Sequence, residues 1–477
     1  MSGKRDAAAG SPAGDDARLT EPPRSLWRHP DFMKLWTGET ISQLGTQVTL
    51  LALPLTAILI LRASPFEVGL LGTLEFLPFI LVGLPAGVWV DRLRRRPVLI
   101  AGDLGRVLAL GSVPLAYELH VLHIGQLYAV AFVSGICTVF FDVAYQAYLP
   151  SLVGREHLVE GNSKLEISRS GAQLAGPGLA GALIQLLKAP VAILADALSY
   201  LASAVFVGWI RKREPEVPAP GSDGGPRPTM RSQIREGLRH VTRSKLLLPI
   251  AACTATGNLF GAMILAILVL FAVRLGLRPG TIGLIFAIGN VGFLIGAFVS
   301  GRAARLFGVG RAIIGGAVLF GFSWLAVPLS TTSTIFPFLV IALTVGGFGS
   351  VVYNVNQVSL RQAITAERMQ GRMNATMRFM VWGTMPIGSF MGGVLGNTIG
   401  LRPTLWVAAI GGAFAFVPPL LSPVRRLRTI PEPEVEGPSQ PEPPLRRVVE
   451  GGDGLVEPGH VPRAPSERAE GALQRID

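Results

Sequence analysis

Acidic side chains inside apolar runs are the residues of this sequence whose type and position suit a chemical role. Glu75 lies near the middle of an apolar run, in LLGTLEFLPFI, with no base within one helical turn. Charge inside a membrane is costly, and such a group usually faces a cavity or a partner. Glu75 is therefore our main candidate for a carboxylate that binds a proton or a cationic substrate and so favours one conformation. A neutral Glu75, hydrogen-bonded between packed helices, is the alternative.

Further polar residues inside apolar runs are weaker candidates. Glu39 lies at the start of the first run, where solvation at the membrane surface would also account for it. Asp196 lies about a third of the way into the sixth run, in ILADALSY, and Asn290 either lines a cavity or ties helices together. Asp103 and Arg106 stand three positions apart on one helical face, which predicts a local ion pair.

A basic turn, GLPAGVWVDRLRRRP, joins two apolar runs at residues 83–97. Its glycines and charged residues are Gly83, Gly87, Asp91, Arg92, Arg94, Arg95 and Arg96. A short basic turn between apolar segments is typical of the cytoplasmic side of a membrane protein. Topology alone calls for no acid here, so Asp91 indicates a further role, with a pure topology signal as the alternative.

Composition places the chain in the membrane class. Of 477 residues, 49% are hydrophobic and 16% are charged, whereas soluble domains carry about 25% charged residues. The formal net charge of +12 does not indicate a nucleic-acid partner, because the arginines fall in the tails and in short loops between apolar runs. The excess of Arg over Lys, with abundant Ala and Gly, indicates a bacterial source.

Twelve apolar runs predict an all-α integral membrane protein with two six-helix bundles. The runs are 37–61, 66–90, 97–118, 124–148, 168–187, 190–210, 247–273, 280–304, 311–330, 335–358, 376–398 and 402–421. The predicted domains are a cytoplasmic tail 1–36, a bundle 37–210, a cytoplasmic linker 211–245 with an amphipathic helix, a bundle 246–421 and a disordered tail 422–477.

The distribution of Arg and Lys predicts the orientation of the helices. Loops that follow even-numbered runs hold most of these residues, so both termini are expected in the cytoplasm, with the helices crossing the plasma membrane. The halves also repeat: Gly83 and Arg92 are nine positions apart, as are Gly296 and Arg305, although Ala304 stands where the first half has Asp91. A parallel repeat of this kind predicts a substrate cavity between the halves near the bilayer midplane.

Enzyme chemistry finds no support in the sequence. The chain has no Walker phosphate loop, so ATP is not the expected energy source, and it has no His or Cys cluster with metal-ligand spacing. We expect no enzyme activity, cofactor or metal. The expected partners are a small-molecule substrate, protons and the lipid bilayer, and the expected state is a monomer.

Four stretches of the sequence resemble the major facilitator superfamily. GVWVDRLRRRP resembles its loop 2–3 motif, although Trp89 replaces a leucine and Arg94 a glycine. LWTGETISQLGTQVTLLALPL and FFDVAYQAYLPSLVGREHLVEGNS resemble the exporter branch that includes enterobactin and macrolide efflux proteins. AGPGLAGAL resembles the Gly-Pro motif of antiporters at Gly176, Pro177 and Gly181, with Ala180 where a second glycine is usual.

The resemblance implies a major facilitator fold and a cytoplasmic latch. Asp91 would face the N-terminal end of the eleventh run, 376–398, and Asp142 would pair with Arg92 or Arg95. The implied function is proton-coupled export of a small amphipathic molecule (a drug, macrolide or siderophore) by alternating access. Uptake or facilitated diffusion on the same fold is one alternative, and a non-transporting membrane sensor or scaffold is another.

Overall fold

The computed structural model describes residues 25–430 apart from 91, 155, 213 and 215–229. Within these residues the chain is helical, with no strand, which confirms the predicted fold class. The predicted tails and most of the predicted linker lie outside the described residues, so the domain boundaries drawn there stay predictions.

The first half contains seven α-helices and a π-helical turn. They are α1 Pro30–Leu55, continued by the π turn Thr56–Ile60, then α2 Pro65–Leu81, α3 Gly83–Val90, α4 Arg95–Glu118, α5 Ile124–Val153, α6 Leu158–Leu187 and α7 Ala189–Gly208. The start of α2 shows why these elements form where they do. Ser64 and Glu67 make a reciprocal capping box there, and Pro65 occupies the first helical position.

The second half follows a short amphipathic helix, α8 Met230–Arg243. Its helices are α9 Leu247–Arg274, α10 Pro279–Gly289, α11 Val291–Phe307, α12 Val309–Ser323, α13 Ala326–Leu329, α14 Ile335–Ala363, α15 Glu367–Trp382, α16 Thr384–Thr398, α17 Leu401–Ala413 and α18 Val417–Leu420. Several predicted spans are thus pairs of consecutive helices.

Each of the twelve predicted runs corresponds to one helix or to such an interrupted pair. In the described part of the chain, ten spans are long and apolar enough to cross a membrane. The remaining two runs correspond to α2 with α3, interrupted at Val82, and to α6, whose first half is polar. Several helices nevertheless extend beyond the predicted ends of their runs. For example, α1 begins at Pro30 and not at residue 37, and α6 begins at Leu158 and not at residue 168.

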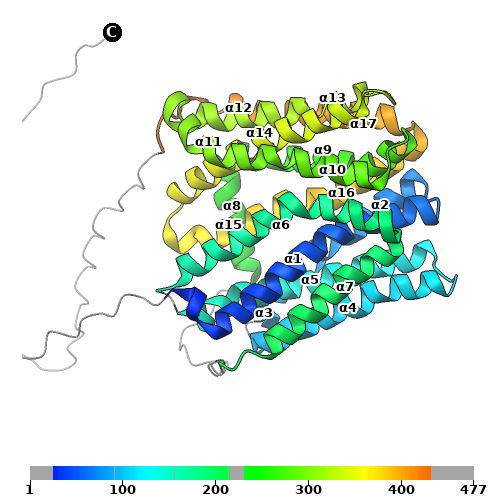
Figure 1. The fold of residues 1–477 in the computed structure, drawn as a ribbon. Helices are drawn as coiled ribbons and strands as arrows, with labels where there is room; N and C mark the ends of the chain where they lie inside the picture. The colour runs from blue at the N-terminus through cyan, green and yellow to red at the C-terminus, as the bar shows by residue number, and fades with distance from the viewer. Residues whose placement is uncertain (1–24, 91, 155, 213, 215–229, 431–477) are drawn as a thin grey trace, which may run out of the picture. The chain divides into compact units, whose positions relative to one another are not determined.

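The two halves meet mainly through four helices. Within the first half, α1 packs on α6 and α7, α4 packs on α5 and α7, and α2 packs on α5. Within the second half, α9 packs on α16 and α17, and α14 packs on α11 and α12. Between the halves, α2 packs on α16 and α6 on α10, and Figure 1 shows these four helices at the centre of the bundle.

The hydrophobic core is shared at one end of the molecule and divided at the other. One buried apolar cluster contains residues of both halves, such as Ile184 on α6 and Ile282 on α10. Two separate clusters lie at the end where α3 turns into α4, one around Leu99 in the first half and one around Met373 in the second. We call this second end the basic-loop end, because the loop there contains residues 92–96. The halves therefore touch at the opposite end, which we call the far end, and they separate toward the basic-loop end.

Candidate functional site

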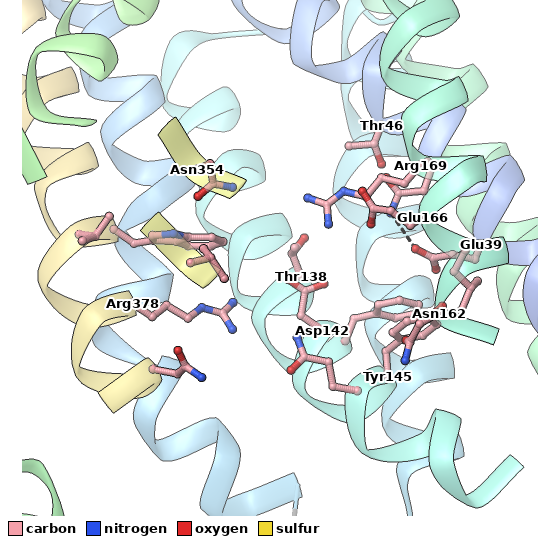
Figure 2. Close-up of a pocket in the computed structure, with 18 of the residues that line it drawn as sticks. Glu39, Thr46, Thr138, Asp142, Tyr145, Asn162, Glu166, Arg169, Asn354 and Arg378 are labelled. Atoms are coloured by element: carbon pink, nitrogen blue, oxygen red, sulfur yellow. Dashed lines mark hydrogen bonds between the residues drawn. The ribbon is translucent and has the colours of Figure 1, made fainter. Parts of the chain in front are cut away.

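A cavity of about 1110 Å³ lies between the two halves. Its lining comes from α1, α4, α5, α6 and α7 on one side and from α9, α14 and α15 on the other (Figure 2). The lining is rich in charged and amide side chains, although the surrounding helices are largely apolar. This is the position that the repeat of the two halves predicts for a substrate cavity.

Glu39 belongs to the cavity wall. Because α1 begins at Pro30 and not at residue 37, Glu39 lies well inside the helix, where its Oε1 accepts a hydrogen bond of 2.7 Å from Gln43 Nε2. One turn further, Thr46 Oγ1 and the Tyr200 hydroxyl lie 2.8 Å apart and join α1 to α7. Glu39 thus faces the cavity beside fixed polar groups, and its role in coupling stays a prediction.

Arg106 is held rigidly at the first-half wall. Its Nη2 donates to Asp103 Oδ1 at 2.6 Å, which confirms the predicted ion pair, and both residues are buried. The guanidinium carbon lies 4.5 Å from the ring centroid of Phe141 and 4.0 Å from that of Tyr200. Two aromatic faces and one carboxylate therefore fix the cation where it lines the cavity.

Asp196 lies on α7 one turn before Tyr200 and behind the cavity surface. It is 1% exposed, and its Oδ1 accepts a hydrogen bond of 3.0 Å from Ser199 Oγ. Gly45 of α1 lies opposite, and a Cβ there would come within 2.5 Å of Asp196 Oδ1. The close packing of α1 on α7 thus leaves Asp196 beside the cavity wall without lining it, and its coupling role also stays a prediction.

Asp142 lines the cavity from α5. Figure 2 shows Arg378 of α15 reaching into the cavity from the side opposite Asp142. Among the described residues, Asp142 has no ion pair with Arg92 or Arg95 in this conformation. A pairing that forms in another conformation remains the prediction.

Glu75 is not among the residues that line the cavity. It lies on α2 where this helix packs closely on α5. A Cβ added to Gly135 of α5 would come within 2.7 Å of the Glu75 carbonyl oxygen. Within the described part of the chain, its carboxylate has no hydrogen-bond or ion-pair partner. The structure thus places the main sequence candidate away from the cavity surface, and its proton-binding role stays a prediction.

The basic loop has structural contacts that sequence reasoning missed. Asp91 lies outside the described residues. Arg96 Nε donates to the carbonyl oxygen of Val207 at 3.1 Å, and its Nη2 donates to that of Gly208, so this arginine caps the C-terminal end of α7. At the start of α4, the Glu214 carboxylate accepts hydrogen bonds from the backbone N–H groups of Arg95 and Arg96 at 2.8 and 2.5 Å. No local spacing connects these residues, which are more than 100 positions apart.

The glycines before the basic loop have open space around them in this conformation. A Cβ added to Gly83 or Gly87 would meet no atom within 4 Å. Gly83 borders a second cavity of about 250 Å³, in which Phe79 of α2 lies near Trp382 of α15. Their ring centroids are 5.3 Å apart in an edge-to-face arrangement. The region of the predicted latch therefore faces α15, which is the first part of the eleventh predicted span.

The antiporter-like motif lies where α6 meets α1 and α10. A Cβ added to Gly176 would come within 2.5 Å of Gln47 Cβ on α1. A Cβ added to Gly181 would come within 2.8 Å of the Pro279 carbonyl oxygen at the start of α10. The buried Pro177 lies between these two glycines. Both glycines are therefore required for close helix packing.

Asn290 also belongs to this junction and does not line the cavity. It lies between α10 and α11, and its Nδ2 donates to the Gln173 carbonyl oxygen of α6. The residue thus joins the two halves, which is the second of the roles considered for it.

Comparison with known proteins agrees with this arrangement. A family described as transmembrane secretion effector matches residues 23–457 of the chain. The chain belongs to this family of the major facilitator superfamily. It is accordingly a multi-pass membrane protein with a transporter fold, and the predicted resemblance is confirmed.

Exporters are among the relatives of this transporter. It is 24% identical to macrolide efflux protein A of Streptococcus pyogenes over 405 residues, which are 83% of this chain and 97% of the relative. It is 27% identical to the enterobactin exporter of Salmonella choleraesuis over 409 residues, which are 83% and 89% of the two chains. Among solved structures, a bacterial homologue of the iron transporter ferroportin in an inward-facing state matches with a TM-score of 0.64 at 18% identity, over 83% of this chain and 99% of that one.

Proposed function

We propose that this transporter is a secondary active exporter of a small amphipathic molecule, driven by a proton gradient through alternating access. The observation that carries the proposal is the division of the core. The halves share one apolar cluster at the far end and have separate clusters at the basic-loop end, with the 1110 Å³ cavity between them. A rocking motion that exchanges the closed and open ends requires this geometry. The exporters among the relatives support the direction of transport.

The predicted orientation makes this conformation open to the cytoplasm. The basic-loop end contains the arginines that the positive-inside rule assigns to the cytoplasmic side. An exporter in this conformation receives its substrate from the cytoplasm. The opposite conformation would close the basic-loop end and bring the predicted latch residues, including Asp91 and Asp142, toward the second half.

Carboxylates at and directly behind the cavity wall support proton coupling. Glu39 lines the cavity, while Asp196 lies behind the wall at 1% exposure. Closing the cavity over an ionised carboxylate removes water from it, and this costs less once the group is protonated. Protonation of one of these groups would thus favour one conformation over the other, and Glu75 is the third candidate.

Transport into inverted membrane vesicles tests the proposal. Vesicles are given radiolabelled macrolides, siderophores and dansylated amphiphiles one at a time, with an imposed proton gradient. Uphill accumulation that collapses with a protonophore is the expected result. Accumulation that only reaches equilibrium would favour facilitated diffusion, and no movement of any probe under any gradient would favour the sensor or scaffold.

The coupling residues are tested in the same vesicles. Glu39→Gln, Glu75→Gln and Asp196→Asn remove the titratable group and keep the side-chain shape. At least one of them is expected to abolish uphill accumulation while downhill exchange continues. If all three variants accumulate substrate normally at equal membrane levels, the coupling assignment is wrong.

A further inference from the structure

The two walls of the cavity differ in charge. The first-half wall has three acids and two bases, which are Glu39, Asp142, Glu166, Arg106 and Arg169. The second-half wall has two arginines, Arg361 on α14 and Arg378 on α15, and no acid among the residues that line it. The remaining polar lining on that side consists of amides, one hydroxyl and the indole N–H of Trp382, all of which can donate hydrogen bonds.

The two second-half arginines have only uncharged partners. Arg361 Nη2 donates to Asn374 Oδ1 at 3.3 Å, and Arg361 Nε is buried without a hydrogen-bond partner. The guanidinium carbon of Arg378 lies 4.6 Å from the ring centroid of Trp382. Within the described residues, no carboxylate lies at ion-pairing distance from either arginine. Neither charge is neutralised by a contact ion pair, so both are available to a ligand in the cavity, which Asp142 borders from the side opposite Arg378.

An apolar recess begins beside these arginines. The second cavity, of about 250 Å³, is lined by apolar side chains of α2, α5 and α15, including Phe79. Asn374, Arg378 and Trp382 line both this recess and the large cavity. A molecule with its polar group at Arg378 would therefore have an apolar pocket directly next to it.

We propose that the substrate is an anionic amphipathic molecule whose carboxylate, sulfonate or phosphate binds Arg361 and Arg378 while its apolar or aromatic part enters the recess at Phe79 and Trp382. This inference rests on the proposed export function and adds the charge class of the substrate. A guanidinium offers paired N–H donors that match such a group, and it keeps its charge in a partly desolvated site. The first-half acids would favour a cationic substrate instead, so the experiment compares the two charges directly.

Binding to the purified full-length protein in nanodiscs tests the proposal. Two fluorescent probes differ only in the group of interest: N-dansylphenylalanine, with a free carboxylate, and its carboxamide. Wild-type protein is expected to bind the carboxylate probe about tenfold more tightly than the amide probe, because only the carboxylate can pair with Arg361 and Arg378 in this partly hydrated site. Added salt is expected to weaken the binding of the carboxylate probe alone, because screening acts on the charge.

Substitutions then assign the preference to the two arginines. Arg361→Gln and Arg378→Gln are each expected to reduce the preference for the carboxylate to about twofold and leave the affinity for the amide unchanged. Arg378→Lys is expected to keep part of the preference for the carboxylate, since the positive charge remains but the planar guanidinium with its paired N–H donors is lost. Arg426→Gln is the matched control, because Arg426 is an exposed arginine of the same half that does not line the cavity.

The apolar part is tested separately. Phe79→Ala is expected to weaken the binding of the carboxylate probe and of the amide probe by the same factor, about fivefold to tenfold, because both probes place the same ring in the recess. A loss confined to one probe would contradict the assigned position of the ring.

Several results would overturn the inference. These are equal binding of both probes to wild type, no binding of the carboxylate, or a preference that survives both arginine substitutions. The inference would also be overturned if the protein bound dansylcadaverine, a cationic probe, more tightly than the carboxylate probe and lost this preference in Asp142→Asn. If the arginine-dependent preference holds but no probe crosses vesicles under any gradient, the anion site stands and the export function fails.

Discussion

Gly181 of α6 and Gly283 of α10 lie against each other with no room for a side chain on either. A Cβ added to Gly283 would come within 2.7 Å of Gly181 Cα, and one added to Gly181 would come within 2.9 Å of Gly283 Cα. Because α6 and α10 belong to different halves, this contact holds the far end of the cavity closed. The antiporter-like motif therefore contributes to the junction between the halves and not to the cavity surface.

Gly283→Val is predicted to shift the protein away from this conformation. The added side chain would separate α6 from α10, and overpacking of this kind costs about 1–3 kcal/mol, which changes the ratio of two states by roughly 5-fold to 150-fold. Spin labels across the far end should report longer distances by electron–electron double resonance, with slower transport. Gly315→Val is the matched control, since a Cβ at Gly315 would meet nothing within 4 Å. Equal distance distributions in both variants would contradict the role of this junction.

The helices were the most predictable part of the fold, because apolar runs of membrane-spanning length leave few alternatives to a helix. Their ends were less predictable. The backbone of α1 and α6 continues beyond the apolar run into polar sequence, so hydropathy marks the span and not the helix. The start of α1 had a usable signal, since Pro30 stands at its first position and His29 Nδ1 accepts a hydrogen bond of 3.0 Å from the Phe32 N–H.

Arg106→Gln is predicted to lower thermal stability because Asp103 would remain buried without its cation. Breaking a buried pair from one side costs about 3–5 kcal/mol. Adding Asp103→Asn to the variant should recover part of this loss, since the uncompensated charge is then removed. Thermal unfolding of the single and double variants in one detergent gives the coupling between the two residues. Additive losses would show that the pair does not act as a unit.

The candidate site was predicted in outline and only partly in its members. A cavity between the halves followed from the repeat, Glu39 was proposed as a coupling residue from its position in the first run, and Asp142 was named only for the latch that the resemblance implies. Arg361, Arg378 and Trp382 were not singled out, because arginines near span ends resemble topology signals. Only the approach of α14 and α15 to the first half, over more than 100 residues of sequence, places them on one cavity wall.

Gly237→Val is predicted to release α8 from α15. A Cβ on Gly237 would come within 3.0 Å of the Arg372 carbonyl oxygen and would clash with Thr376 Oγ1. The ion pair of Glu236 with Arg372, at 2.5 Å, is too exposed to hold α8 alone, since such pairs contribute about 0–1 kcal/mol. Hydrogen exchange over residues 230–243 should become faster. Gly371→Val is the control on α15, because a Cβ there would meet nothing within 4 Å. Unchanged exchange in Gly237→Val would rule out this packing.

Arg96→Ala is predicted to destabilise the protein more than Arg92→Ala, although both arginines belong to the same basic turn. Arg96 donates to the carbonyl oxygens of Val207 and Gly208 at the end of α7, whereas Arg92 is exposed and makes no side-chain hydrogen bond or ion pair among the described residues. Each hydrogen bond from a charged donor contributes about 1.5–3 kcal/mol, so the loss of two such bonds should make the difference between the variants at least about 1.5 kcal/mol. Thermal unfolding of both variants in the same detergent measures it. Equal stability would show that the cap on α7 is dispensable, and would leave Arg96 with the gating role that its motif predicts.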